Sequence, residues 1–400
     1  MLYKGCAGSI WEMVTFMTEQ TTGSERKAHT LRPPTIWVGL ALLLALGFPS
    51  VTLTIQATDP LPGMPPLLDP RDIYAANRPG QLSPAVQGFP ERVYVPNSGS
   101  DTVDVIDPQT FKIVEHFAVG REPQHVTPSY DLKTLWALSD LGDNITKIDP
   151  ITGKKVETIP VMDPYNMYYT PDGRYAIVVA ERLRRLDFRD PQTMKVVESV
   201  RVPCRGVDHM DFSADGRYLI ASCEFSGELV KVDVASRKLI GTLKVSGHAM
   251  PQDVRLNPDG SVFYAADMAS DGVHMIDGDS FKIIGFIPTG KGAHGLYFSR
   301  DSKWMYVSNR GEGTISLVDT KTRKVSTKWT IPGGGSPDMG GVSGDGKVLW
   351  LSGRYHAEVY ALDTADGHLL ARIKVGKGPH GLCFYPQPGR YSLGHTGNMR

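Results

Sequence analysis

A short pattern returns along most of the chain in steps of 41 to 44 residues, and this recurrence limits the fold more than any other feature. Each copy ends a strand-like segment with an apolar or basic residue followed by Asp. The seven aspartates in these positions are Asp107, Asp149, Asp190, Asp233, Asp277, Asp319 and Asp363. A period near 42 residues with room for four short strands is typical of a β-propeller, in which each repeat supplies one blade.

The order of segments within one period is consistent with a four-stranded blade. In the period that ends near residue 245, a first strand reaches the turn Ser-Ala-Asp-Gly at 213–216, and a second strand follows at 218–222. Asp and Gly suit the backbone angles of such a tight turn. The fourth segment, 238–245, carries lysines, which suit an outer edge strand that must not pair with other chains.

The two ends of the repeat region are out of phase, and this predicts how the ring closes. The first unit begins with a second-type strand at 92–95, and the last unit is followed by a lone first-type strand at 380–384. Pairing these segments would leave no incomplete blade. We therefore predict an all-β fold over residues 92–386, a seven-bladed β-propeller with four-stranded antiparallel blades, in which the C-terminal strand completes the first blade.

Two segments resemble the YVTN motif of the YVTN-repeat β-propeller family. They are Tyr-Val-Ser-Asn at 306–309 and, more loosely, Tyr-Val-Pro-Asn at 94–97, and the Thr-x-x-Val-Ile-Asp pattern and Pro-Asp-Gly turns match the rest of that repeat. The resemblance covers residues 92 to about 386 and implies the propeller fold. Relatives of this kind include envelope and surface-layer proteins, lactonases, lyases, amine dehydrogenase subunits and haem-d1-type propellers, so the resemblance leaves the function open.

The N-terminal region predicts export from the cytoplasm. No charged residue occurs from 33 to 58, and this apolar run is long enough to span a bilayer as a helix. Arg26, Lys27 and Arg32 precede it, which favours a cytoplasmic segment at 1–34 and a propeller in the cell envelope. Residues 35–57 are read as a transmembrane anchor or as a signal segment cleaved after Ala57. Eight prolines between 60 and 90 indicate a semi-extended spacer at 58–91.

Composition and cysteine content exclude two classes of protein. Lys plus Arg and Asp plus Glu both number 43, so no basic excess indicates a nucleic-acid partner. Four cysteines are too few for a disulfide-stapled scaffold. Cys204 and Cys223 fall in one predicted blade, where they form either a bridge in an oxidising compartment or two small buried residues.

The candidate site is the mouth of the central channel, where the innermost strands of all blades begin. Two adjacent positions per strand, counted back from each turn, contribute the polar residues His125, Asn166, Asp208, His209, Asp253, His294, Asp338 and His380. Imidazole and carboxylate groups suit a divalent transition metal such as Zn, Cu or Fe, with His125, His209, His294 and His380 as candidate ligands. They also suit acid–base catalysis. Alternatively, these residues only line a solvated funnel or join neighbouring blades. Because successive strand residues point to opposite sides, the two positions are not expected to face the channel equally.

The function predicted from these features is that of an extracytoplasmic propeller, membrane-tethered or secreted. Its mouth would bind an unidentified envelope protein or a small ligand. The alternatives are a metal- or haem-dependent oxidoreductase, a cofactor-handling propeller, or a lactonase or lyase that uses the same residues. Nucleophile-elbow, Walker and His-Glu-x-x-His motifs do not occur, so the sequence does not decide whether the chain is an enzyme. Residues 387–400 are expected to be a disordered tail; folded over a propeller face, this tail would bring His395 to the mouth.

Overall fold

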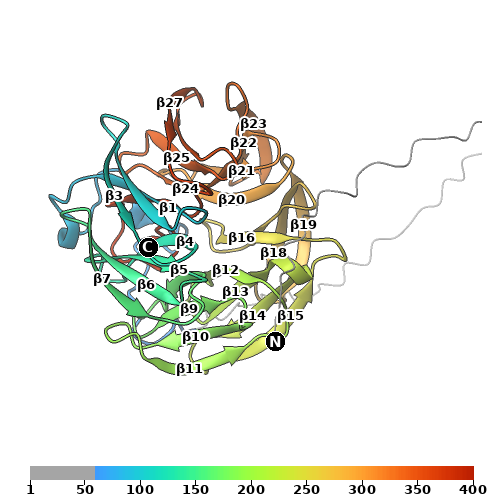
Figure 1. Cartoon of the computed structure of the whole chain (residues 1–400). Coiled ribbons are helices and arrows are strands. Elements are labelled where there is room, and N and C mark those ends of the chain that lie inside the picture. Colours follow the sequence, from blue (N-terminus) through green and yellow to red (C-terminus); the bar gives the residue numbers. More distant parts are fainter. Residues whose placement is uncertain (1–58) are drawn as a thin grey trace, which may run out of the picture. The chain divides into compact units, whose positions relative to one another are not determined.

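A computed structural model describes residues 59–400 of the protein (Figure 1). The predicted cytoplasmic segment and the predicted anchor or signal segment lie outside the described residues. Within residues 59–400, no helix has the length and apolar character needed to span a bilayer. The structure in this range consists of strands and three short 3-10 helices, η1 (Ala75–Asn77), η2 (Pro84–Val86) and η3 (Glu224–Ser226).

The strands form seven four-stranded antiparallel sheets, which confirms the predicted seven-bladed propeller. The innermost strands are β28 (Cys383–Tyr385), β4 (Pro123–Pro128), β8 (Asn166–Tyr169), β12 (Val207–Phe212), β16 (Pro251–Leu256), β20 (Ala293–Phe298) and β24 (Pro337–Val342). The second strands are β1 (Arg92–Asn97), β5 (Leu135–Ser139), β9 (Ala176–Ala180), β13 (Tyr218–Cys223), β17 (Phe263–Asp267), β21 (Trp304–Asn309) and β25 (Val348–Gly353). The third strands are β2 (Thr102–Asp107), β6 (Asn144–Asp149), β10 (Arg185–Arg189), β14 (Glu228–Asp233), β18 (Gly272–Asp277), β22 (Thr314–Asp319) and β26 (Glu358–Asp363). The outermost strands are β3 (Lys112–Ala118), β7 (Lys154–Pro160), β11 (Val196–Arg201), β15 (Lys238–Lys244), β19 (Lys282–Pro288), β23 (Lys324–Thr330) and β27 (Leu369–Lys374).

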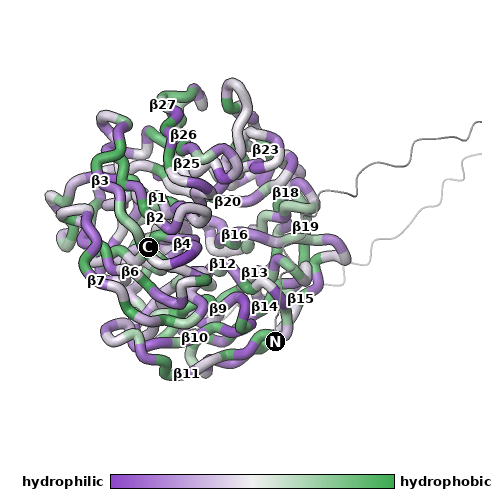
Figure 2. The backbone as a smooth tube through the Cα atoms, in the orientation of Figure 1, coloured by the Kyte–Doolittle hydropathy of each residue, from purple (hydrophilic) through white to green (hydrophobic). Residues whose placement is uncertain are grey.

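The strands become more exposed from the centre of the propeller outward. Every residue of β9 is buried, whereas the residues of β15 alternate between exposed and half-buried. Figure 2 shows the corresponding mixture of hydrophobic and hydrophilic residues along the strands. The apolar core lies between blades; Trp350 of β25, for example, packs with Phe384 of β28 in a buried cluster that joins the first and last blades. The core therefore holds the blades in place around the central strands.

The ring closes through the C-terminal strand. β28 pairs antiparallel with β1, with Val93 opposite Phe384. The strand itself is shorter than the expected segment 380–384, because Gly381 instead forms a bridge to His125 of the neighbouring blade. The residues just before β28 thus sit between two blades, and this position carries His380 to the channel.

Residues 59–91 lie against the propeller and do not form the semi-extended spacer that we expected. Leu61, Ile73 and Tyr74 are buried, and the Ile73 amide donates a hydrogen bond of 2.8 Å to the Pro258 carbonyl. The prolines indicated an extended chain, but the apolar residues between them bury surface against the turns of the blades, which stabilises a fixed path.

The expectation of a disordered C-terminal tail is wrong, because the tail enters the channel. The Leu393 carbonyl accepts a hydrogen bond of 3.0 Å from the Tyr169 amide, so the tail extends the sheet at β8. The Arg400 guanidinium lies 2.9 Å from Asp211, and both side chains are buried. These contacts carry His395, which is fully buried, towards the mouth.

Cys204 and Cys223 form a disulfide, with their Cα atoms 6.0 Å apart. This observation decides between the two alternatives left by the sequence. The bridge joins the segment before β12 to the end of β13, and it therefore braces the strand start from which Asp208 and His209 emerge. Among the described cysteines, Cys383 is free and buried.

Candidate functional site

The innermost strands are irregular where they begin, and this irregularity allows adjacent residues to reach the channel together. The pairing register shifts near the starts of β4, β12, β16, β20 and β24. A β-bulge of this kind bends the strand and re-aims its side chains. Two adjacent positions were predicted at the start of each innermost strand. The first of them contributes His294 and His380, and the second contributes His125 and His209. The expectation that the two positions would not face the channel equally neglected these bulges.

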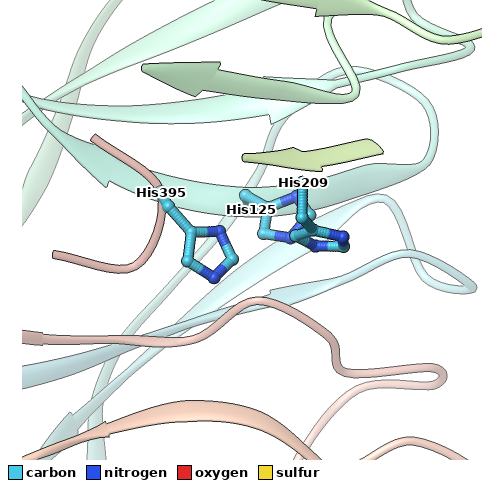
Figure 3. Close-up of side chains that lie close together, drawn as sticks. All are labelled: His125, His209 and His395. Atoms are coloured by element: carbon cyan, nitrogen blue, oxygen red, sulfur yellow. The ribbon is translucent and has the colours of Figure 1, made fainter. Parts of the chain in front are cut away.

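Three imidazole rings meet at the centre of the mouth, and we call His125, His209 and His395 the histidine group (Figure 3). One ring nitrogen of each lies within 4.8 Å of the others. The Nε2 atoms of His125 and His209 are 3.3 Å apart. Figure 3 shows His395 approaching this pair from the C-terminal tail. The group therefore combines two blades with a segment outside the repeats.

Each ring of the histidine group has a polar neighbour that orients it. His125 Nδ1 is 2.9 Å from the Tyr165 carbonyl, which can only accept, so the proton resides on Nδ1 and Nε2 has a free lone pair. A carboxylate oxygen of Asp208 lies 3.5 Å from His209 Nδ1. Asn166 Nδ2 donates to His395 Nδ1 over 3.0 Å, which places the His395 proton on Nε2, in contrast to His125. Carbonyl and carboxylate neighbours of this kind commonly hold metal-binding histidines in position.

A second group, which we call the Asp338 group, consists of His294, Asp338 and His380. His294 Nδ1 is 3.0 Å from Asp338 Oδ1, and His380 Nε2 is 3.7 Å from Asp338 Oδ2. The Arg310 guanidinium contacts Oδ1 at 3.1 Å. The two groups are adjacent, because the ring centroids of His125 and His380 are 4.8 Å apart.

The mouth is shielded from solvent, and burial sets its ionisation. Burial lowers the pKa of His209 and of His294 to about 4, so both rings are neutral near neutral pH. Burial alone would raise the pKa of Asp338, but His294 and Arg310 hold it well below its usual range. Burial raises the pKa of Asp208 well above its usual value. Neutral imidazole and ionised carboxylate are the forms that bind a metal ion.

Many polar atoms at the mouth are buried without a hydrogen-bond partner. They are Asp208 Oδ2, His209 Nδ1, Asp253 Oδ1, Asp338 Oδ2, His380 Nδ1 and His395 Nε2. A buried polar atom left unsatisfied costs about 1–3 kcal/mol. A water, an ion or a polar ligand at the mouth would satisfy these atoms.

The eight residues chosen from the sequence all lie at this mouth. Asp253 and Asn166 reach it as neighbours of His395: Asp253 Oδ1 is 3.8 Å from His395 Nε2, and Asn166 contacts the other ring nitrogen. His395 itself was absent from the chosen set. The repeat places only residues within its period, and the sole signal for His395 was a tail long enough to cross a propeller face.

Comparison with known proteins identifies the family. The model of the YNCE-like β-propellers matches residues 80–388. The chain belongs to this family. YNCE-like relatives include the uncharacterized protein YncE of Salmonella typhimurium strain LT2, 20% identical over 270 residues that cover 62% of this chain and 73% of the relative. The YncE protein of Salmonella typhi is 21% identical with the same coverage. The resemblance seen in the repeat is thereby confirmed.

Solved structures with the same fold come from proteins of different activities. Kuenenia stuttgartiensis hydrazine synthase has a TM-score of 0.59 at 17% identity, over 76% of this chain and 99% of that chain. The dihydro-heme d1 dehydrogenase NirN in complex with DHE has a TM-score of 0.56 at 17% identity, over 76% of each chain. A putative 6-phosphogluconolactonase from Bacteroides uniformis has a TM-score of 0.59 at 17% identity, over 74% of this chain and 99% of that chain. At such identity these likenesses show the fold alone.

Proposed function

We propose that this YNCE-like propeller is an exported binding module of the cell envelope, membrane-tethered or secreted, and that its channel mouth binds a divalent transition metal ion. The binding site is His125 and His209 of the histidine group, with the His395 ring packed beside them. The observation that carries the proposal is the close approach of His125 Nε2 and His209 Nε2 inside a buried mouth that holds several unpartnered polar atoms.

The distance between these two nitrogens fits a shared ion. Zinc–nitrogen bonds of about 2.0–2.1 Å at a tetrahedral angle place two ligand nitrogens about 3.3–3.4 Å apart. The two Nε2 atoms are 3.3 Å apart. His125 Nε2 is unprotonated, so with the His209 proton on Nε2 the contact is a hydrogen bond from His209 to His125. With that proton on Nδ1, beside Asp208, two lone pairs face each other, and a cation bound between them turns the contact into an attraction.

The exported location is supported by two features. Disulfides such as Cys204–Cys223 form and persist mainly in oxidising compartments outside the cytoplasm. The uncharged run at 33–58 has the length of a membrane-spanning or signal segment. An envelope location would also give the mouth access to metal ions outside the cytoplasm.

The alternative ligand is a haem-type cofactor, since one solved neighbour is described as a complex with DHE. Ring packing at the mouth argues for the smaller ligand. Centroid separations among His125, His209, His294 and His380 run from 4.8 to 6.4 Å, so these rings occupy the place that a macrocycle would need. A lactonase or lyase would act through the same residues, and no contact at the mouth selects that reaction.

The test is metal analysis of the full chain, purified without a histidine tag and dialysed against Zn²⁺ and then against a weak chelator. We expect retained zinc and no visible chromophore, and we expect His209→Gln to lose the ion. His368→Ala is the matched control, because His368 is an exposed histidine beside Asp366 and Asp363. Absence of retained metal, or equal retention by the wild type and His209→Gln, would overturn the proposal; a haem-like absorption spectrum would favour the alternative.

A further inference from the structure

We infer that the mouth binds two metal ions rather than one, and that the second ion is bound by the Asp338 group. This inference rests on the proposed function, because the first ion is the one assigned to the histidine group. It adds a second set of ligands, His294, Asp338 and His380. The mouth would then be a two-metal centre instead of a single-ion site.

The Asp338 group brings three potential ligand atoms within 4.8 Å of one another. For metal–ligand bonds of about 2.0–2.2 Å, neighbouring ligand atoms lie about 3.0–3.5 Å apart, depending on coordination number. His380 Nε2 lies 3.7 Å from Asp338 Oδ2, close to this range, and His294 Nδ1 lies 3.0 Å from the other carboxylate oxygen, Oδ1. Both histidine side chains are buried.

The two oxygens of Asp338 have different surroundings, as expected for a carboxylate that binds a metal through one oxygen. Oδ1 accepts a hydrogen bond from Arg310. Oδ2 is buried and has no hydrogen-bond partner. Its neighbour is His380 Nε2, 3.7 Å away. An ion pair between Arg310 and Asp338 accounts for Oδ1 but leaves Oδ2 unsatisfied at a cost of about 1–3 kcal/mol. A metal ion on Oδ2, with Arg310 orienting the carboxylate from the other side, accounts for both oxygens.

The spacing of the two groups places the ions next to each other. The ring centroids of His125 and His380 are 4.8 Å apart, and those of His209 and His294 are 6.4 Å apart. In two-metal sites the ions are about 3.5–4 Å apart. The ion of the Asp338 group would have three protein ligands, and the ion of the histidine group would have two, His125 and His209, because His395 Nδ1 accepts a hydrogen bond from Asn166. Both ions keep open positions, so a water or hydroxide can bridge them.

The experiment loads the untagged full chain with Cu²⁺, removes weakly bound ions with a chelator, and measures both copper per chain and the electron paramagnetic resonance signal. We expect two copper ions per chain and a signal much smaller than two isolated ions would give, because adjacent Cu²⁺ spins couple. His294→Gln and His380→Gln should each lower the content to one ion and restore a single-ion signal. The control His368→Ala should retain two ions and the weak signal.

The outcomes separate the inference from the proposed function. One ion in the wild-type protein, retained by His380→Gln and lost by His209→Gln, would overturn the second ion and leave the proposed function standing. No retained ion would overturn both. Two ions with a full, uncoupled signal would refute an adjacent pair. If a glutamine variant does not fold, as judged by its circular dichroism, the copper content and spin coupling of the wild type still decide the question.

Discussion

The disulfide between Cys204 and Cys223 gives the most quantitative prediction. The two residues are 19 positions apart in the sequence. In the chain-entropy model, a cross-link that closes a loop of this length removes enough unfolded-state freedom to stabilise the folded state by about 3 kcal/mol. We therefore expect the double variant Cys204→Ala/Cys223→Ala to lose about this much of the free energy of unfolding.

The assay is equilibrium unfolding in urea, followed by tryptophan fluorescence, with and without a thiol reductant. For an m-value of about 3 kcal/mol per molar, a loss of about 3 kcal/mol lowers the unfolding midpoint by about 1 M. We expect the reductant to lower the midpoint of the wild type by a similar amount and to leave the double variant unchanged. The matched control is Cys383→Ala, which removes the free buried cysteine and should keep the full response to the reductant.

Two results would refute this reasoning. If the reductant lowered the midpoint of the double variant as much as that of the wild type, the effect would not come from the bridge. If the double variant unfolded at the wild-type midpoint, the loop would already be constrained by its contacts in β12 and β13, and the entropy argument would not apply.

Three further predictions concern packing, charge and pH. Gly340→Ala should destabilise the fold by about 3 kcal/mol, since its Cβ would lie 1.8 Å from the Trp350 carbonyl oxygen, and the thermal midpoint measures this loss. Arg400→Ala leaves Asp211 buried without its cation and should cost about 3–5 kcal/mol in urea unfolding. Burial raises the pKa of Glu181 from 4.5 to about 9, so the folded state retains a proton that the unfolded chain releases. Stability should therefore fall as the pH rises from 4.5 to about 9, and Glu181→Gln should reduce that slope in thermal unfolding.

Each of these predictions has a control in the same chain. Gly247→Ala should be neutral, because no atom lies within 4 Å of its Cβ. Arg400→Lys retains a cation near Asp211 and should lose less than Arg400→Ala. Glu157→Gln, at an exposed site on β7, is the control for the same exchange of a carboxyl for an amide. Equal losses in a variant and its control would contradict the explanation given for that site.

The blade architecture could be predicted because it is periodic. The step between aspartates sets the number of blades, and the offset between segments 92–95 and 380–384 indicates the closure. The same alignment of the repeats places His125, His209, His294 and His380 where the innermost strands begin. The bulges could not be predicted, because they depend on the pairing of β4, β12, β16, β20 and β24 with their second strands and not on the local sequence.

The segments outside the repeat were the ones predicted poorly. Residues 59–91 and the tail have no period, so proline content and terminal position were the only guides. Their actual paths are set by long-range contacts such as Ile73 with Pro258 and Leu393 with Tyr169. His395 is positioned by the same kind of contact. The missing member of the site was therefore one whose place depends on the folded propeller.

The pairing of β28 with β1 has a consequence for biogenesis. Because β1 begins at Arg92 and β28 at Cys383, the first blade stays incomplete until almost the whole chain has been synthesised. If the chain is exported as we propose, the ring can close only after the C-terminal strand has crossed the membrane. His395 follows β28 in the sequence, so it is synthesised after the strand that closes the ring. A chain truncated before β28 would thus have neither a closed ring nor a complete site.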